Sequence, residues 1–187
     1  MASDVDICNS ALNMIGASNI VSLTEDSRAA RVCNQRFEFV RDAVSRAHPW
    51  NCLMRRAAFE FEHQHLMPND PYCLRVIRAQ DLDTIFRVEG RKILSDTTPF
   101  NFIYVARVTD PNEYDQLLIE AIAARLAADI SYALVNSATL TQSLFQLYEN
   151  KVSEARFVDA TEGIPDNVIN QDRSLFVESD IFTSARF

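Results

Sequence analysis

The side chains that could do chemistry are few, and the histidines come first among them. The chain has three, His48, His63 and His65, and the last two stand two residues apart. A strand would place both imidazoles of that pair on one face, which is a geometry that a metal ion can use. No Asp, Glu or Cys is placed with any specificity as a further ligand, so we predict that no metal is bound.

The other candidate nucleophiles and acids also lack a recognisable arrangement. The four cysteines form no Cys-x-x-Cys pair and are expected to be buried, reduced thiols: Cys8, Cys33, Cys52 and Cys73. No Gly-x-Ser-x-Gly elbow occurs, and three glycines are too few for the usual phosphate-binding loops. The acid pairs 60/62 and 81/83 look like solvent-facing carboxylates of strands or loops. We therefore predict no catalytic residue and no cofactor.

The distribution of charge is more informative than its total. A net charge of −8 argues against a general nucleic-acid binder. From Asp26 to Arg56 there are seven arginines and three acids, whereas from Asp110 to Asp159 there are eight acids and three bases. Two interpretations stay open: both stretches are solvated helix faces, or an arginine-rich face of one copy pairs with an acidic face of another.

One carboxylate looks out of place. Asp129 lies in an apolar, alanine-rich segment, where a buried charge requires a partner. Arg28, Arg31 and Arg36 stand on the preceding arginine-rich segment and are the candidate partners. The sequence thus predicts an ion pair that is either structural or between subunits.

These residues must be positioned by helices at both ends of the chain. Apolar residues recur at intervals of three and four within 3–15 and within 30–47, which predicts two amphipathic helices. Gly16 suits the end of the first, and the second is expected to open at Thr24 or Asp26. Pro49 ends it, and the only Trp of the chain follows. We expect Trp50 to fill the corner between helices and sheet, with a direct contact to a partner as the alternative.

The middle of the chain reads differently. Residues 51–107 carry short runs in which β-branched and aromatic residues alternate with polar ones, which predicts a small antiparallel sheet of three to five strands. The run "VEGRKI" indicates a hairpin that turns at Gly90. Asp110 and Pro111 are expected to start a third helix, and a fourth is expected over 138–159.

The resulting fold class is α+β. A four-helix bundle is expected from 1–50 and 108–160, with the antiparallel β subdomain 51–107 inserted and an extended C-terminal arm over 161–187. The arm is rich in apolar and aromatic side chains, which disordered tails usually lack. It is expected to lie on its own domain or on a neighbouring subunit, and its candidate interface residues are Leu175, Phe176, Phe182 and Phe187.

Several blocks of the sequence resemble a known family. The stretch "DICNSALNMIGASNIVSLTEDSRAARVCNQRFEFVRDAVSRAHPWN" is similar to the opening of the phage head-to-tail adaptor family, which includes tail tubular protein A of short-tailed phages. The segments "VEGRKILSD" and "VTDPNEYDQLLIEAIAARLA" also resemble it, as does the order of two helices, a β insertion and two helices. The resemblance covers roughly residues 4–160, and no motif extends it into the arm.

The resemblance implies a structural virion protein of the neck, made in the host cytoplasm, with no enzymatic activity. Family members form a ring, usually of about twelve copies, below the portal protein. The ring continues the DNA channel without binding DNA specifically, and it receives the tail nozzle or tail fibres. Three alternatives stay open: a virion-associated peptidoglycan hydrolase, a DNA-packaging accessory, or a connector of a long-tailed phage. No membrane span is expected, because no apolar run approaches the roughly 20 residues that a bilayer requires. No secretory signal is expected either, since the chain opens with acids.

Overall fold

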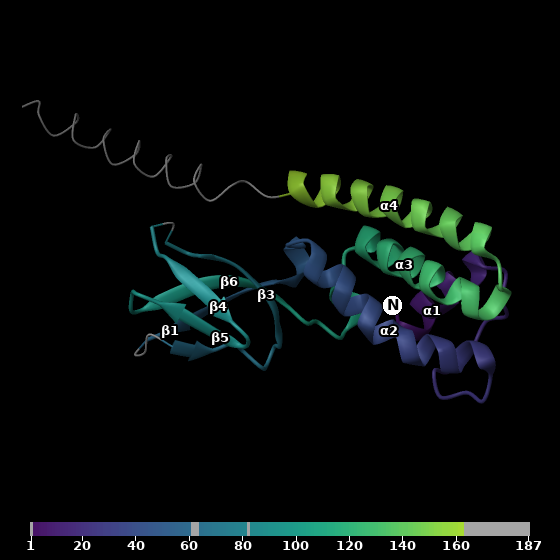
Figure 1. Cartoon of the computed structure of the whole chain (residues 1–187), viewed down its shortest axis with the longest axis horizontal. Coiled ribbons are helices and arrows are strands. Elements are labelled where there is room, and N and C mark those ends of the chain that lie inside the picture. The colour runs from purple at the N-terminus through teal and green to yellow at the C-terminus, as the bar shows by residue number, and fades with distance from the viewer. Residues whose placement is uncertain (1, 61–63, 82, 163–187) are drawn as a thin grey trace, which may run out of the picture.

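The computed structural model describes residues 2–60, 64–81 and 83–162. The helices gather at one end of an elongated molecule and the strands at the other (Figure 1). The four main helices are α1 (Asp4–Met14), α2 (Arg28–Ala47), α3 (Gln116–Val135) and α4 (Ala138–Thr161). The predicted α+β class is confirmed, with two helices before and two after the inserted β region.

The two N-terminal helices owe their ends to local chemistry. Ser3 caps α1: its hydroxyl accepts from the Asp6 N–H at 3.1 Å, and the Asp6 carboxylate accepts from the Ser3 N–H at 3.0 Å. Gly16 follows α1 with a φ of +70°. The predicted start of α2 at Thr24 or Asp26 is three residues or one residue too early, because Ser27 is the residue that caps it. The helix ends at Ala47, two residues before Pro49.

Helix α3 is the centre of the helical core, because α1, α2 and α4 all pack against it. Its alanines are buried and permit close approach of its neighbours; they are Ala121, Ala123, Ala124, Ala127 and Ala128. Asn136 takes a left-handed conformation with φ of 57° and turns the chain into α4, which runs beside α3 (Figure 1).

The predicted start of the third helix was also wrong. Asp110 and Pro111 begin only a 3-10 turn, Pro111–Glu113, and Asp115 is the residue that caps α3. Between them Tyr114 is extended, buried, and donates its hydroxyl to the Val108 carbonyl at 2.5 Å. Burial of this one ring in the helical core thus interrupts a sequence that would otherwise continue the turn into a helix.

In the described residues, six strands form two antiparallel three-stranded sheets, where the sequence predicted one sheet of three to five strands. The first sheet has the order β1–β6–β3 and the second β2–β5–β4. The strands are β1 (Met54–Phe59), β2 (Gln64–Leu66), β3 (Cys73–Ala79), β4 (Phe86–Glu89), β5 (Lys92–Ser95) and β6 (Phe100–Ala106). The hairpin predicted at Gly90 is present as β4–β5.

Strand β6 is shared between two cores. Phe100, Phe102 and Tyr104 alternate along it and belong to the aromatic core of the β region. Val105, on the opposite face, belongs to the core of the helices. A strand buried on both faces needs apolar residues, and this one has them at every position except the exposed Asn101.

The described helices include none that combines the length and the hydropathy needed to cross a bilayer. Helix α4 continues to Thr161, two residues beyond its expected end. The arm predicted over 161–187 lies outside the described residues from position 163 onward.

Candidate functional site

The corner that follows α2 is built around Trp50. Its side chain is fully buried among helical residues, and its indole Nε1–H donates to the Val44 carbonyl at 3.1 Å. The His48 ring meets the indole edge-on, with ring centroids 4.7 Å apart. Pro49 stands between these two rings in the chain and prevents α2 from continuing. The indole therefore packs against the helix that precedes it.

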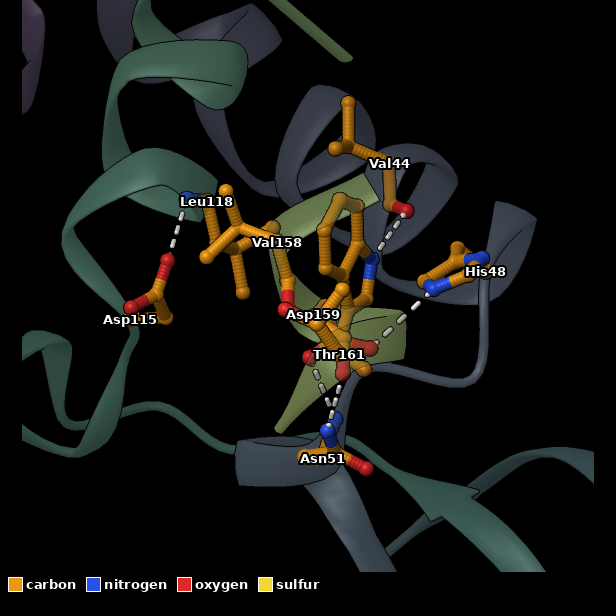
Figure 2. A network of polar contacts seen from close by, with 9 residues as sticks. Val44, His48, Asn51, Asp115, Leu118, Val158, Asp159 and Thr161 are labelled. Atoms are coloured by element: carbon orange, nitrogen blue, oxygen red, sulfur yellow. Dashed lines mark hydrogen bonds and ion pairs between the residues drawn. The ribbon is translucent and has the colours of Figure 1, made fainter. Parts of the chain in front are cut away.

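The same corner is tied to the last turn of α4 by Asp159 (Figure 2). One carboxylate oxygen accepts from the Asn51 N–H at 2.9 Å, and the other lies 3.1 Å from His48 Nε2. The Asn51 side-chain amide donates to the Asp159 carbonyl at 2.7 Å. The Asp159 side chain is only 8% exposed, so these contacts are shielded from water. His48, Trp50, Asn51 and Asp159 are referred to below as the corner clamp.

A His–Asp pair is also part of many catalytic sites, but here it lacks a nucleophile. In the described part of the chain, no hydroxyl or thiol forms a hydrogen bond with His48. Burial raises the pKa of the nearby Cys52 thiol, which is the opposite of what activates a cysteine. The arrangement suits a structural connection between α4 and the entry to the β region rather than acyl or proton transfer.

The structure brings Asp129 together with one of its three predicted partners. Arg36 of α2 lies 2.5 Å from the Asp129 carboxylate, and Arg125 approaches it at 3.7 Å. Arg28 instead donates to the Ala133 carbonyl of α3, and Arg31 pairs with Asp26 on the surface. The ion pair is thus formed within one copy of the chain.

An exposed aromatic ring stands one helical turn from each member of this pair. Phe39 follows Arg36 on α2 and is 69% exposed; Tyr132 follows Asp129 on α3 and is 59% exposed. Because residues three apart share a helix face, the two rings and the ion pair lie on one surface of α2 and α3. The Arg36 guanidinium lies 5.9 Å from the centre of the Phe39 ring. We refer to these four residues as the α2–α3 face.

The cysteines and histidines form no metal site in residues 2–60, 64–81 and 83–162, where no cluster of three potential ligands occurs. All four thiols are free. A hydrogen bond with Cys33, together with burial, raises the pKa of Cys8, so that thiol stays protonated. His65 is buried and stacks on Phe59 at 4.2 Å between ring centroids. His63 lies outside the described residues.

Asp159 was missed as a site residue, although its spacing offered a signal. It shares one buried face of α4 with Val152 and Ala155, which precede it by seven and four residues along the helix. An acid on such an apolar face requires partners, as Asp129 does. The arm residues Leu175, Phe176, Phe182 and Phe187 lie outside the described residues, so the structure places none of them.

No protein-family model matches the chain, and no curated protein matches it.

Proposed function

We propose that this chain is a structural virion protein, a head-to-tail adaptor that assembles as a ring below the portal of a short-tailed phage. In this role it continues the DNA channel and attaches the tail nozzle or tail fibres. The observation that carries the proposal is the element order together with the adaptor-like motifs. Two helices, an inserted β region and two further helices are present, and the adaptor-like "HPWN" run forms the corner that separates helices from strands.

The α2–α3 face supports assembly into a multimer. Exposed aromatic rings beside arginines are enriched at protein interfaces, whereas isolated exposed aliphatic residues are common on any surface. Phe39 and Tyr132 flank an ion pair that fixes α2 against α3, so the surface is presented by two helices held rigidly together. A neighbouring copy that covers both rings would gain apolar burial without ordering a loop.

The remaining features fit a protein that acts by contact. The corner clamp offers no nucleophile in the described residues, and a net charge of −8 suits a channel through which DNA passes without specific binding. We propose that the arm, through Leu175, Phe176, Phe182 and Phe187, adds apolar contacts to a neighbouring subunit or to the portal. The site of action is the neck of the virion.

The test is the mass of the purified chain, alone and mixed with the portal protein of the same virus. Full-length protein should form a large complex of defined mass. Removal of residues 163–187, which leaves α4 intact, should weaken it. The variant Phe39→Ser with Tyr132→Ser should also weaken it, whereas Val21→Ser, at a loop residue that is 90% exposed, should not. The proposal would be refuted if the protein stayed a monomer and did not bind the portal protein. If that monomer also degraded peptidoglycan, the hydrolase alternative would be favoured.

A further inference from the structure

Four arginines from distant parts of the chain line one cleft where the helices meet the β region. The cleft has a volume of about 560 Å³. Arg46 comes from the last turn of α2, Arg75 from β3, Arg91 from the β4–β5 turn, and Arg107 follows β6. This set is referred to below as the arginine cleft.

The charge of the arginine cleft is poorly compensated. Among the described residues Asp42 is the only carboxylate that lines it, so four arginines minus one acid leave an excess of three positive charges there. Asp42 is itself shared, since one of its oxygens accepts from Arg41 at 3.1 Å and the other pairs with Arg107. Guanidinium groups crowded in a concave surface repel one another, and an anion placed among them would relieve this repulsion.

Two of the guanidinium groups are already held in place. Both lie against the ring of Tyr72, with their central carbons 4.0 Å (Arg91) and 4.4 Å (Arg107) from its centre. Arg91 also donates to the Pro68 carbonyl at 3.0 Å. Arginines fixed in this way lose little further side-chain freedom when they bind an acceptor.

Donors remain available in the arginine cleft. The Arg107 Nε–H is buried and has no acceptor among the described residues. Arg46 donates to the Leu74 carbonyl, and Arg75 donates to the Arg46 carbonyl at 3.3 Å. A guanidinium carries five N–H donors, so within the described structure both groups keep several for an external acceptor.

We propose that the arginine cleft binds a protein segment that presents carboxylates beside an apolar side chain. Carboxylates match the planar donor fork of arginine. The apolar part of the lining, which includes Met67, Val76 and the half-exposed Val88, suits a peptide better than a sugar-phosphate chain. The net charge of −8 also works against a nucleic acid, which carries charge along its entire length. This inference goes beyond the proposed ring and does not depend on it.

The test uses the full chain and a short fluorescein-labelled peptide in which Glu alternates with Leu, with binding followed by fluorescence anisotropy. The same peptide with Gln in place of Glu should bind about tenfold more weakly or worse. Arg75→Gln and Arg107→Gln should each weaken binding of the Glu peptide by about tenfold. Arg87→Gln, at an exposed position of β4 outside the cleft, should leave it unchanged.

Several outcomes would overturn the inference. Wild-type protein that does not bind the Glu peptide, or that binds the Gln peptide equally well, would do so. An equal loss in Arg87→Gln would show general charge attraction only. The inference would also fail if a single-stranded oligonucleotide of equal charge bound more tightly than the Glu peptide and Arg75→Gln and Arg107→Gln both abolished that binding. The arginine cleft would then be assigned to nucleic acid. Since Arg107→Gln also breaks the Asp42 pair, Arg75→Gln is decisive if Arg107→Gln does not fold.

Discussion

Removal of the Asp159 carboxylate is expected to destabilise the whole helical region. In Asp159→Ala the Asn51 N–H and the His48 ring both lose their acceptor in a nearly dry corner. Hydrogen bonds to a charged group contribute about 1.5–3 kcal/mol each, so two predict a loss of about 3–6 kcal/mol. The His48 side chain is 20% exposed, so its ring can form a hydrogen bond with water instead. We therefore expect the unfolding free energy to fall by about 3 kcal/mol, at the lower end of this range.

The only tryptophan of the chain provides the assay. Trp50 lies in the corner clamp, so its fluorescence reports on the perturbed region, while circular dichroism reports on all helices. In urea, both signals should give one transition with a lower midpoint and an unchanged slope. For a chain of this length the same loss corresponds to a fall in Tm of about 6–12 °C.

The matched control is Glu154→Ala, an exposed acid on the same helix, which should change stability by no more than about 0.5 kcal/mol. Both changes introduce Ala into α4, so differences in helix propensity largely cancel. A double-mutant cycle with His48→Ala separates the ring contact from the backbone contact. The reasoning is refuted if Asp159→Ala loses no more stability than Glu154→Ala does.

Three further predictions concern single residues elsewhere. Burial raises the pKa of Tyr114 from 10.0 to about 12, so the folded protein holds this proton while the unfolded chain loses it. Stability should therefore fall as pH rises between these values, and urea titrations of Tyr114→Phe should show a shallower fall than wild type. His65 Nε2 is buried without a hydrogen-bond partner among the described residues, so His65→Phe should raise the unfolding free energy, by about 1 kcal/mol. If thermal unfolding gave His65→Phe a lower unfolding free energy than wild type, the His65 ring would have a hydrogen-bond partner. Gly90 has φ of 58° with open space around its missing side chain, so Gly90→Ala should cost about 1 kcal/mol through backbone strain alone. Gly90→Asn should cost less, and equal losses would point to a lost contact instead.

Local rules predicted the features of the fold that are decided locally. The stripes of α1 and α2, the stop at Pro49 and the hairpin at Gly90 each depend on residues within one or two turns. The start of α3 could not be predicted in this way, because burial of the Tyr114 ring outweighs the turn signal of Asp110 and Pro111. The division into two sheets likewise follows from aromatic packing around β6, and not from any single strand.

The candidate sites were harder to predict, since long-range convergence creates them. Asp129 could be identified because a charge interrupts an apolar helix, but three arginines were equally placed in sequence to pair with it. Nothing local distinguishes Arg46, Arg75 and Arg107 from the other arginines of the chain. The three arginines share only their position in the fold, since all lie where α2, β3 and the end of β6 meet.

The pairing of β1 with β6 has a consequence for how such a protein can evolve. The chain leaves the helices through β1 and returns through β6, and Met54 lies opposite Val105 in an antiparallel pair. Both crossings therefore run through one two-stranded stem, which the Arg55–Glu113 ion pair at 2.8 Å braces against the segment before α3. The β2–β5–β4 sheet beyond the stem can be lengthened, shortened or exchanged while the helices keep their packing, whereas β3 cannot, because its Leu74 belongs to the helical core. The β2–β5–β4 sheet can thus diverge in sequence at a different rate from the helices and the strands that pack on them.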